Sequence, residues 1–243
     1  MRNAGRNAAK RCRALVRKGN ELLERGDAAG AASAYRQALS LSPENSGTHY
    51  NLALALARLG DPARQKIELQ KAIELDPNRV EAHNQLGTLY LVEGNLAKAE
   101  QEFKTALETD PAFAEAKNNL GAVFVCLGRV NEALALFQQA TEDDPRASQA
   151  FLNWGLLLAQ QGKFTQAEEK LNRAKELSPD SPDVYTALGM VAVETGRPDD
   201  ARPLFEKALA LKPGSAEATR ALEGLKQPSG RVPADSPART VPN

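Results

Sequence analysis

The sequence is poor in the residues that mark several common classes of protein. Its two cysteines, Cys12 and Cys126, are too few and too far apart in 243 residues for a disulfide framework. No apolar run approaches the roughly 18 residues that span a bilayer. The first twenty residues also lack the apolar core of a signal peptide. Membrane insertion is therefore not expected, and the cytoplasm is the default expectation for location.

The chain also lacks an excess of charge of either sign. Lysine plus arginine and aspartate plus glutamate number 31 each, so the basic surplus typical of a nucleic-acid binder is missing. The start is nevertheless basic, and seven cationic residues precede the first acid, Glu21: Arg2, Arg6, Lys10, Arg11, Arg13, Arg17 and Lys18. Organelle transit peptides also begin Arg-rich and acid-free. We interpret residues 1–11 instead as a solvated basic tail that leads into the first helix.

Aromatic residues make up only 5% of the chain, and the apolar residues are mainly alanine and leucine, which favour helix. The main positive signal is a period of 34 residues in three separate series. Prolines recur as Pro43, Pro77, Pro111, Pro145, Pro179 and Pro213. Glycines recur as Gly26, Gly60, Gly94, Gly128, Gly162 and Gly196, and alanines as Ala38, Ala72, Ala106, Ala140, Ala174 and Ala208. Such a period predicts a repeat architecture.

Each repeat is predicted to hold two helices. With the proline as the thirty-second position, the repeats are 12–45, 46–79, 80–113, 114–147, 148–181 and 182–215. The first helix ends at the glycine, which suits a C′ residue with positive φ. Asp27, Asp61 or Asn95 follows and caps the second helix, which stops before the proline.

Small residues at the eighth and twentieth positions, such as Gly87 and Ala99, let the two helices of a pair approach closely. Two positions depart from the pattern. Gln65 replaces the small twentieth residue of repeat two and is expected to loosen that hairpin. Pro203 falls within the second helix of repeat six, which is therefore expected to start late or to bend.

The pattern resembles the tetratricopeptide repeat family, in period and in the positions of its small, aromatic and proline residues. The resemblance covers residues 12–215 and implies an all-α fold, a right-handed α-solenoid of six helix-turn-helix hairpins. Residues 216–226, with Ala218, Ala221, Leu222 and Leu225 at helical spacing, are predicted to form a capping helix. Residues 227–243 contain four prolines among polar residues and are predicted to be disordered.

Residues that carry chemistry are scarce. The two histidines, His49 and His83, both occupy the fourth position of a first helix, which indicates a packing role where adjacent repeats meet. A cysteine nucleophile requires a nearby histidine as its base, and neither histidine lies in the same repeat as a cysteine. No phosphate-binding loop motif occurs. We therefore expect no catalytic residues, no metal, no cofactor and no enzymatic activity.

The resemblance also implies a binding site, because in this family the first helices line a concave groove. Carried over to this sequence, the peptide-binding positions are Asn20, Tyr50, Asn51, Leu54, Asn84, Gln85, Leu91, Asn118, Asn119, Val125, Leu152, Asn153, Leu156 and Met190. Val92 belongs to the same apolar set. An apolar strip of this kind favours an extended peptide or an amphipathic helix as ligand.

A row of carboxamides stands out among these positions. Four consecutive repeats carry one at the sixth position: Asn51, Gln85, Asn119 and Asn153. A carboxamide both donates and accepts, so it can pair with a peptide unit. The row is similar to the asparagine ladder in the repeats of protein O-glycosyltransferases. The alternative is that asparagine is merely common at this position and faces solvent.

A two-carboxylate clamp, which other members use to hold the acidic C-termini of chaperones, is not expected here. Asn20 and Asn51 match its two asparagines. Its first lysine is replaced by Val16, however, and its last two basic residues by Glu81 and Gln85.

The sequence thus predicts a non-catalytic scaffold or adaptor that binds a partner protein in its groove. Two alternatives remain. The chain is a solenoid that associates with itself, or it is a substrate-recruiting subunit of a separate enzyme such as a protein glycosyltransferase. The partner is not encoded in the pattern, because a fold does not fix a function.

Overall fold

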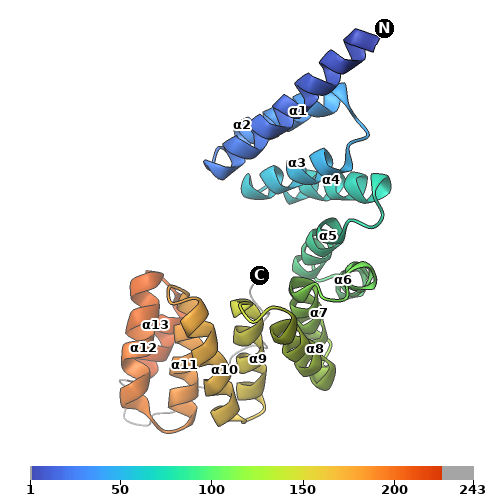
Figure 1. Ribbon diagram of the computed structural model, residues 1–243. Helices are drawn as coiled ribbons and strands as arrows, with labels where there is room; N and C mark the ends of the chain where they lie inside the picture. Colours follow the sequence, from blue (N-terminus) through green and yellow to red (C-terminus); the bar gives the residue numbers. More distant parts are fainter. Residues whose placement is uncertain (1, 226–243) are drawn as a thin grey trace. The chain divides into compact units, whose positions relative to one another are not determined.

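The computed structural model describes residues 2–225, with side chains from residue 7 onward, and in this range the chain is helical without strands (Figure 1). The predicted all-α class is therefore confirmed. The helices are α1 (Arg2–Glu24), α2 (Ala28–Leu41), α3 (Ser46–Arg58), α4 (Pro62–Leu75), α5 (Val80–Val92), α6 (Leu96–Thr109), α7 (Ala114–Cys126), α8 (Val130–Asp143), α9 (Ser148–Gln160), α10 (Phe164–Leu177), α11 (Pro182–Glu194), α12 (Pro198–Leu211) and α13 (Ala216–Gly224).

Consecutive helices pack in pairs, α1 with α2 through α11 with α12, and α13 packs against α12 and α11. The chain divides into two compact units. The first, Met1–Pro111, holds the helices up to α6, and the second, Ala112–Asn243, holds those from α7 onward.

The turn inside each pair is the same in all six repeats. The glycine that follows the first helix has a positive φ of 69–84°, as predicted, and only glycine adopts this conformation without strain. In the first repeat, the backbone N–H of Asp27 donates to the carbonyl of Leu22, five residues back, which satisfies a helix-end carbonyl. The predicted caps are confirmed: the side chains of Asp27, Asp61 and Asn95 accept from the backbone of the next helix at 2.8, 3.0 and 3.3 Å.

The eighth-position glycines fix how closely the paired helices approach. A Cβ atom on Gly87 would lie 2.7 Å from Cε1 of Phe103, and one on Gly121 would lie 2.6 Å from the same atom of Phe137. Both rings are fully buried. The glycine therefore provides the surface on which the large side chain of the second helix packs, and this contact forms much of the core of a pair.

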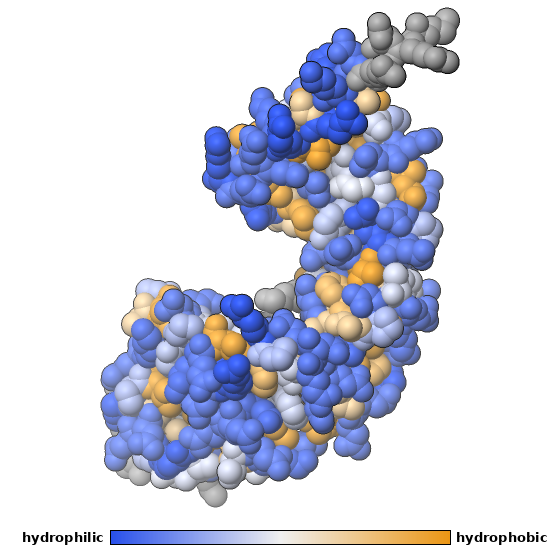
Figure 2. Space-filling view, viewed as in Figure 1, coloured by the Kyte–Doolittle hydropathy of each residue, from blue (hydrophilic) through white to orange (hydrophobic). Residues whose placement is uncertain are grey.

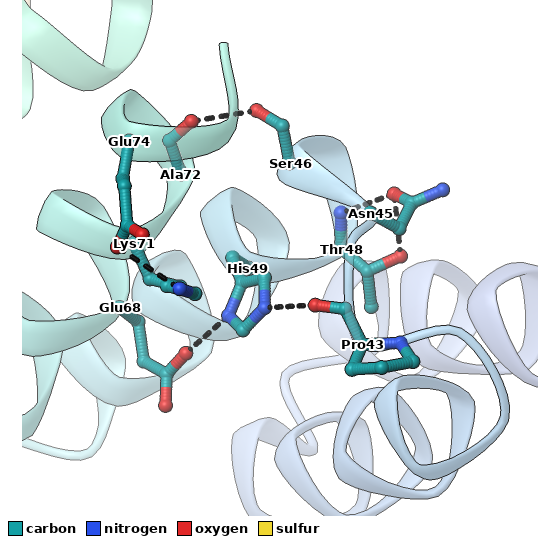
Figure 3. Close-up of polar contacts among 9 residues, drawn as sticks. All are labelled: Pro43, Asn45, Ser46, Thr48, His49, Glu68, Lys71, Ala72 and Glu74. Carbon is teal, nitrogen blue, oxygen red and sulfur yellow. Dashed lines mark hydrogen bonds and ion pairs between the residues drawn. The ribbon is translucent and has the colours of Figure 1, made fainter.

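Both histidines tie adjacent repeats together through two hydrogen bonds. His49 on α3 lies with Nδ1 2.7 Å from Oε2 of Glu68 on α4 and with Nε2 2.9 Å from the carbonyl oxygen of Pro43, in the preceding loop (Figure 3). His83 makes the same two contacts, at the same distances, with Glu102 and Pro77. The fourth-position side chain therefore links its own second helix to the end of the preceding repeat.

Helix α12 and the N-terminal segment differ from what the sequence predicted. Helix α12 begins at Pro198 and continues through Pro203 to Leu211, so it does not start late. Pro203 has no backbone N–H, so the carbonyl of Asp199, four residues earlier, lacks its helical hydrogen bond. Asp199 is exposed to water. The basic segment expected to precede the first helix is itself helical from Arg2. The tail 227–243 lies outside the described residues.

The visible surface is largely hydrophilic, with small separate apolar spots (Figure 2). The large apolar side chains that the described residues expose are Leu41, Leu59, Ile67, Val92 and Leu127. Within the described part of the chain, no helix combines the length and the apolar character required of a membrane span. Cys12 and Cys126 belong to different units, and both are free thiols.

Candidate peptide-binding surface

The predicted binding residues lie on the first helices of the repeats. Within the first unit α1 contacts α3, and within the second unit α9 contacts both α7 and α11, so first helices of adjacent repeats lie side by side. The structure does not place all fourteen predicted residues on an open surface. They fall into a buried set, a half-buried apolar set, the pair Asn20 and Asn51 beside a pocket, and the half-buried amides Gln85 and Asn119.

Four of the predicted residues are buried, so they cannot contact a ligand directly. Asn84, Asn118 and Asn153 are 1%, 6% and 4% exposed, and Leu152 is 2% exposed. No buried side-chain nitrogen or oxygen in the described residues lacks a hydrogen-bond partner, so these amides are satisfied inside the protein.

Two of these buried amides join neighbouring repeats. Nδ2 of Asn153 on α9 donates to Oδ1 of Asn118 on α7 at 2.9 Å. Nε2 of Gln149, one turn earlier on α9, donates to Oδ1 of Asn153 at 3.1 Å. In the second unit the carboxamide at the sixth position of repeat five therefore holds two first helices together.

A different arrangement occurs in the first unit, where Asn20 is exposed and Asn51 is half-buried. Oδ1 of Asn20 accepts two hydrogen bonds, from the hydroxyl of Tyr35 at 2.8 Å and from Nδ2 of Asn51 at 3.2 Å. These bonds orient both amides. Among the described residues, Nδ2 of Asn20 and Oδ1 of Asn51 have no partner, so a donor and an acceptor stand next to each other at the surface.

These two amides line an open pocket of about 210 Å³ between α1, α2 and α3. The other lining residues are Leu23, Glu24, Tyr35 and Arg58. The guanidinium of Arg58 donates to the carbonyl of Leu23, which holds α3 against the end of α1. Burial raises the pKa of the Tyr35 hydroxyl, while the charge of Arg58 acts in the opposite direction. The hydroxyl is therefore neutral at physiological pH and is available as a donor.

Sequence reasoning missed Tyr35, Glu24 and Arg58. A signal for Tyr35 was present, because it occupies the twenty-fourth position of its repeat, where repeats three, four and six have Phe103, Phe137 and Phe205. A hydroxyl at that position is unique to the first repeat. No comparable pattern marks Glu24 or Arg58.

The apolar members of the predicted set are mostly half-buried rather than fully open. They are Tyr50, Leu54, Leu91, Val125, Leu156 and Met190. Leu54, Leu156 and Met190 each pack against a hydrophobic core cluster with part of their surface. Val92, at the end of α5, is 63% exposed. Gln85 and Asn119 are also half-buried.

The arrangement suits non-covalent recognition. A neighbouring donor and acceptor match the C=O and N–H of one residue in an extended peptide, and partly exposed aliphatic side chains offer contacts for apolar residues. Among the described residues, no group of three or more His, Cys, Asp and Glu side chains is placed to hold a metal ion.

Five family models match the chain along most of its length. Four described as tetratricopeptide repeat match residues 46–79, 68–101, 118–182 and 182–222, and one described as TPR repeat matches residues 19–60. No curated protein matches significantly in sequence.

Solved structures share the fold at low sequence identity. A chain of the APC/C hetero-tetramer Cut9–Hcn1 aligns with a TM-score of 0.83 and 18% identity over 90% of this chain, which spans only 43% of that chain. PilF of Pseudomonas aeruginosa aligns with a TM-score of 0.75 and 20% identity, covering 88% of this chain and 97% of PilF. YrrB, a TPR protein with an unusual peptide-binding site, aligns with a TM-score of 0.56 and 24% identity over 79% of this chain and 99% of its own.

These likenesses establish a common fold, and that fold is typical of scaffolds for protein–protein interaction. Together with the family-model matches and the six helix pairs, they show that the chain belongs to the tetratricopeptide repeat family.

Proposed function

We propose that the protein is a non-catalytic scaffold that binds an extended segment of a partner protein along its first helices. The observation that carries the proposal is the Asn20–Asn51 pair, which presents a free donor and a free acceptor at a pocket in the first unit. In an extended peptide the N–H and C=O of one residue point to the same side, so a single residue can pair with both amides at once.

The pocket is prepared before a ligand arrives. Tyr35 is fully buried, and its hydroxyl holds Asn20, which in turn holds Asn51. Side chains fixed in the unbound protein lose less conformational entropy on binding, so their hydrogen bonds contribute more of their energy to affinity. The buried amides of the second unit are not part of this proposed site, because Asn118 and Asn153 are already paired with each other.

Apolar contacts supply the rest of the recognition. Leu54 lies one turn from Asn51 on α3, and it is only half-buried. Within the second unit by itself, Val125, Leu156 and Met190 offer a separate set of partial surfaces on α7, α9 and α11. The relation to YrrB, whose peptide-binding site is described as unusual, is compatible with peptide recognition in this fold but specifies no ligand.

Peptide selection provides a direct test. Peptides are selected from a random display library on the full chain, and their affinities are then measured on the Asn51→Ala variant. Asn131→Ala, which removes an exposed amide from α8, is the matched control. We expect Asn51→Ala to weaken binding by about tenfold, equivalent to one hydrogen bond of about 1.4 kcal/mol, and the control to leave binding unchanged.

A second measurement asks whether the peptide main chain is recognised. Single N-methyl groups are introduced along a selected peptide, and each removes one backbone donor. Loss of affinity at one or two adjacent positions in the wild type, without further loss in Asn51→Ala, supports pairing with the amides. Selected peptides that bind Asn51→Ala and the wild type equally well contradict the proposal.

A further inference from the structure

The first helix pair carries a net positive charge, and the rest of the chain carries an equal net negative charge. Residues 1–41 contain nine basic and three acidic residues, a net charge of +6, whereas residues 42–243 contain 22 basic and 28 acidic residues, a net charge of −6. The overall neutrality therefore conceals a separation of charge along the chain. Such asymmetry often indicates an electrostatic interaction site at the charged end.

The structure places this charge on one continuous helix. Helix α1 has 23 residues, whereas α3, α5, α7, α9 and α11 have 13 each. The extra length comes from residues 2–11, ahead of the first repeat. The first helix pair thus begins with a cationic helical extension that the other repeats lack.

The cations of α1 are unusually free of acidic partners. Five are exposed: Lys10, Arg11, Arg13, Arg17 and Lys18. Within the described residues, only Arg17 is near a carboxylate, with Nε 3.9 Å from Oε1 of Glu21, and both of those side chains are mostly exposed. Helix α2, which packs against α1, contains no acidic residue.

Cations elsewhere are commonly paired. The guanidinium of Arg197 lies 2.8 Å from the carboxylate of Glu168, and the ammonium of Lys66 lies 2.7 Å from that of Glu93. Mixed charges, as on the rest of the molecule, are enough to keep a helix surface soluble, so solubility alone does not explain a surface of one sign.

Three of these cations share one helix face with the pocket. Lys10, Arg13 and Arg17 are spaced by three and four residues, and Asn20 follows Arg17 by three. At 1.5 Å per residue, Lys10 and Asn20 are about 15 Å apart along the helix axis, a distance that about five extended residues span. We call Lys10, Arg13 and Arg17 the basic face of α1.

We propose that the basic face of α1 binds acidic side chains of a partner protein, adjacent to the residues that occupy the Asn20–Asn51 pocket. The proposal rests on the proposed function, and it adds a charge preference at one end of the same surface. A peptide with acidic residues on one side of its pocket-binding unit gains Coulomb energy that a neutral peptide does not.

Other anionic partners fit the observations less well. A helix that inserts into a membrane surface needs large apolar residues exposed opposite its charges. The residues of α1 before Cys12 include no apolar residue larger than alanine, and Val16, Leu22 and Leu23 pack in a hydrophobic core cluster. A long polyanion such as a nucleic acid would also experience the net charge of −6 on the rest of the chain. A short acidic segment contacts the basic face alone.

Fluorescence anisotropy on the full chain tests the proposal with a labelled hexaglutamate peptide and its hexaglutamine counterpart. The test variant is Lys10→Gln, Arg13→Gln, Arg17→Gln. The control, Lys163→Gln, Arg202→Gln, Lys212→Gln, removes the same charge from exposed positions of the second unit. We expect the wild type and the control to bind hexaglutamate at least about tenfold more tightly than hexaglutamine, and the test variant to lose this preference.

Additional variants and ligands distinguish this inference from the proposed function and from other anionic partners. An Asn20→Ala, Asn51→Ala variant that keeps hexaglutamate binding but loses the selected peptides shows that the two parts of the surface act separately. Retained charge preference with no role for Asn51 leaves this inference standing and overturns the proposed function. Equal losses in the test and control variants, or tighter binding of a short oligothymidylate or of phosphatidylserine vesicles than of hexaglutamate, overturn the inference. The charge-reversed variant Lys10→Glu, Arg13→Glu, Arg17→Glu should prefer hexalysine, which guards against a loss caused by misfolding.

Discussion

Nδ1 of His83 lies 2.7 Å from the carboxylate of Glu102, and the other ring nitrogen lies 2.9 Å from the carbonyl oxygen of Pro77. Both neighbours are acceptors when the carboxylate is ionised, so both ring nitrogens must carry protons to make both bonds. The hydrogen bond with Glu102 raises the pKa of His83, and burial opposes this effect. These two contacts therefore stabilise the imidazolium form relative to the neutral ring.

This preference makes stability depend on pH. A raised folded-state pKa contributes stability that is fully present below the unfolded pKa, about 6.5, and is lost as the pH rises through the folded pKa. We expect the free energy of unfolding to fall by about 1 kcal/mol between pH 6 and pH 8.5 on account of His83. Urea unfolding at several pH values measures this change.

Repeat six supplies a matched control for this prediction. Tyr185 occupies the equivalent fourth position, and its hydroxyl donates to the carbonyl of Pro179 at 2.9 Å. His83→Tyr therefore keeps a donor to Pro77 but does not titrate between pH 6 and pH 8.5. A wild type and a His83→Tyr variant with the same pH dependence in this range contradict the assignment.

The contact between Gly87 and Phe103 leads to a prediction about packing. A methyl group at Gly87 would lie 2.7 Å from the buried ring, so Gly87→Ala should destabilise the pair by about 1–3 kcal/mol despite the better helix propensity of alanine. Repeat two has Ala53 and Leu69 at the same two positions. The double variant Gly87→Ala, Phe103→Leu should therefore recover part of the loss in thermal unfolding. A double variant less stable than the sum of its single variants argues against this contact as the cause.

The buried amides lead to a different prediction from the exposed ones. Asn153→Ala leaves the buried Oδ1 of Asn118 without its donor and should cost about 1–3 kcal/mol of stability. Asn51→Ala removes a longer bond at a half-exposed site and should cost less than about 1 kcal/mol. Urea unfolding of both variants compares them directly. Equal effects would mean that the two amides play the same role.

Sequence reasoning predicted the backbone well because each repeat marks its own ends. The glycine, the polar residue after it and the proline set the helix limits locally, and the structure follows them at Gly26, Asp27 and Pro43. The histidine bridges left a signal that was not used: the glutamates Glu68 and Glu102 each follow a histidine by 19 residues.

The exposure of the amides depended on neighbours that a single repeat does not reveal. Asn51 and Asn153 both occupy the sixth position, but Asn153 meets Asn118 from the preceding repeat, whereas Val16 occupies the position equivalent to Asn118 in repeat one. Asn153 therefore pairs with a buried amide, whereas Asn51 pairs with the exposed Asn20 at the surface. The site therefore followed from contacts between repeats rather than from the position within each one.

Pro203 provides a final prediction about helix α12. It lies inside the helix, where it removes one backbone donor, and its side chain is exposed, so no packing depends on it. Pro203→Ala restores a donor to the Asp199 carbonyl and should stabilise the helix by about 1–2 kcal/mol, after the greater entropy of the unfolded chain is deducted. Hydrogen exchange should show slower exchange of the amides around Ala201 and Phe205, with no change in α2. Faster exchange in α12 would mean that the proline stabilises this helix, which would reverse the prediction.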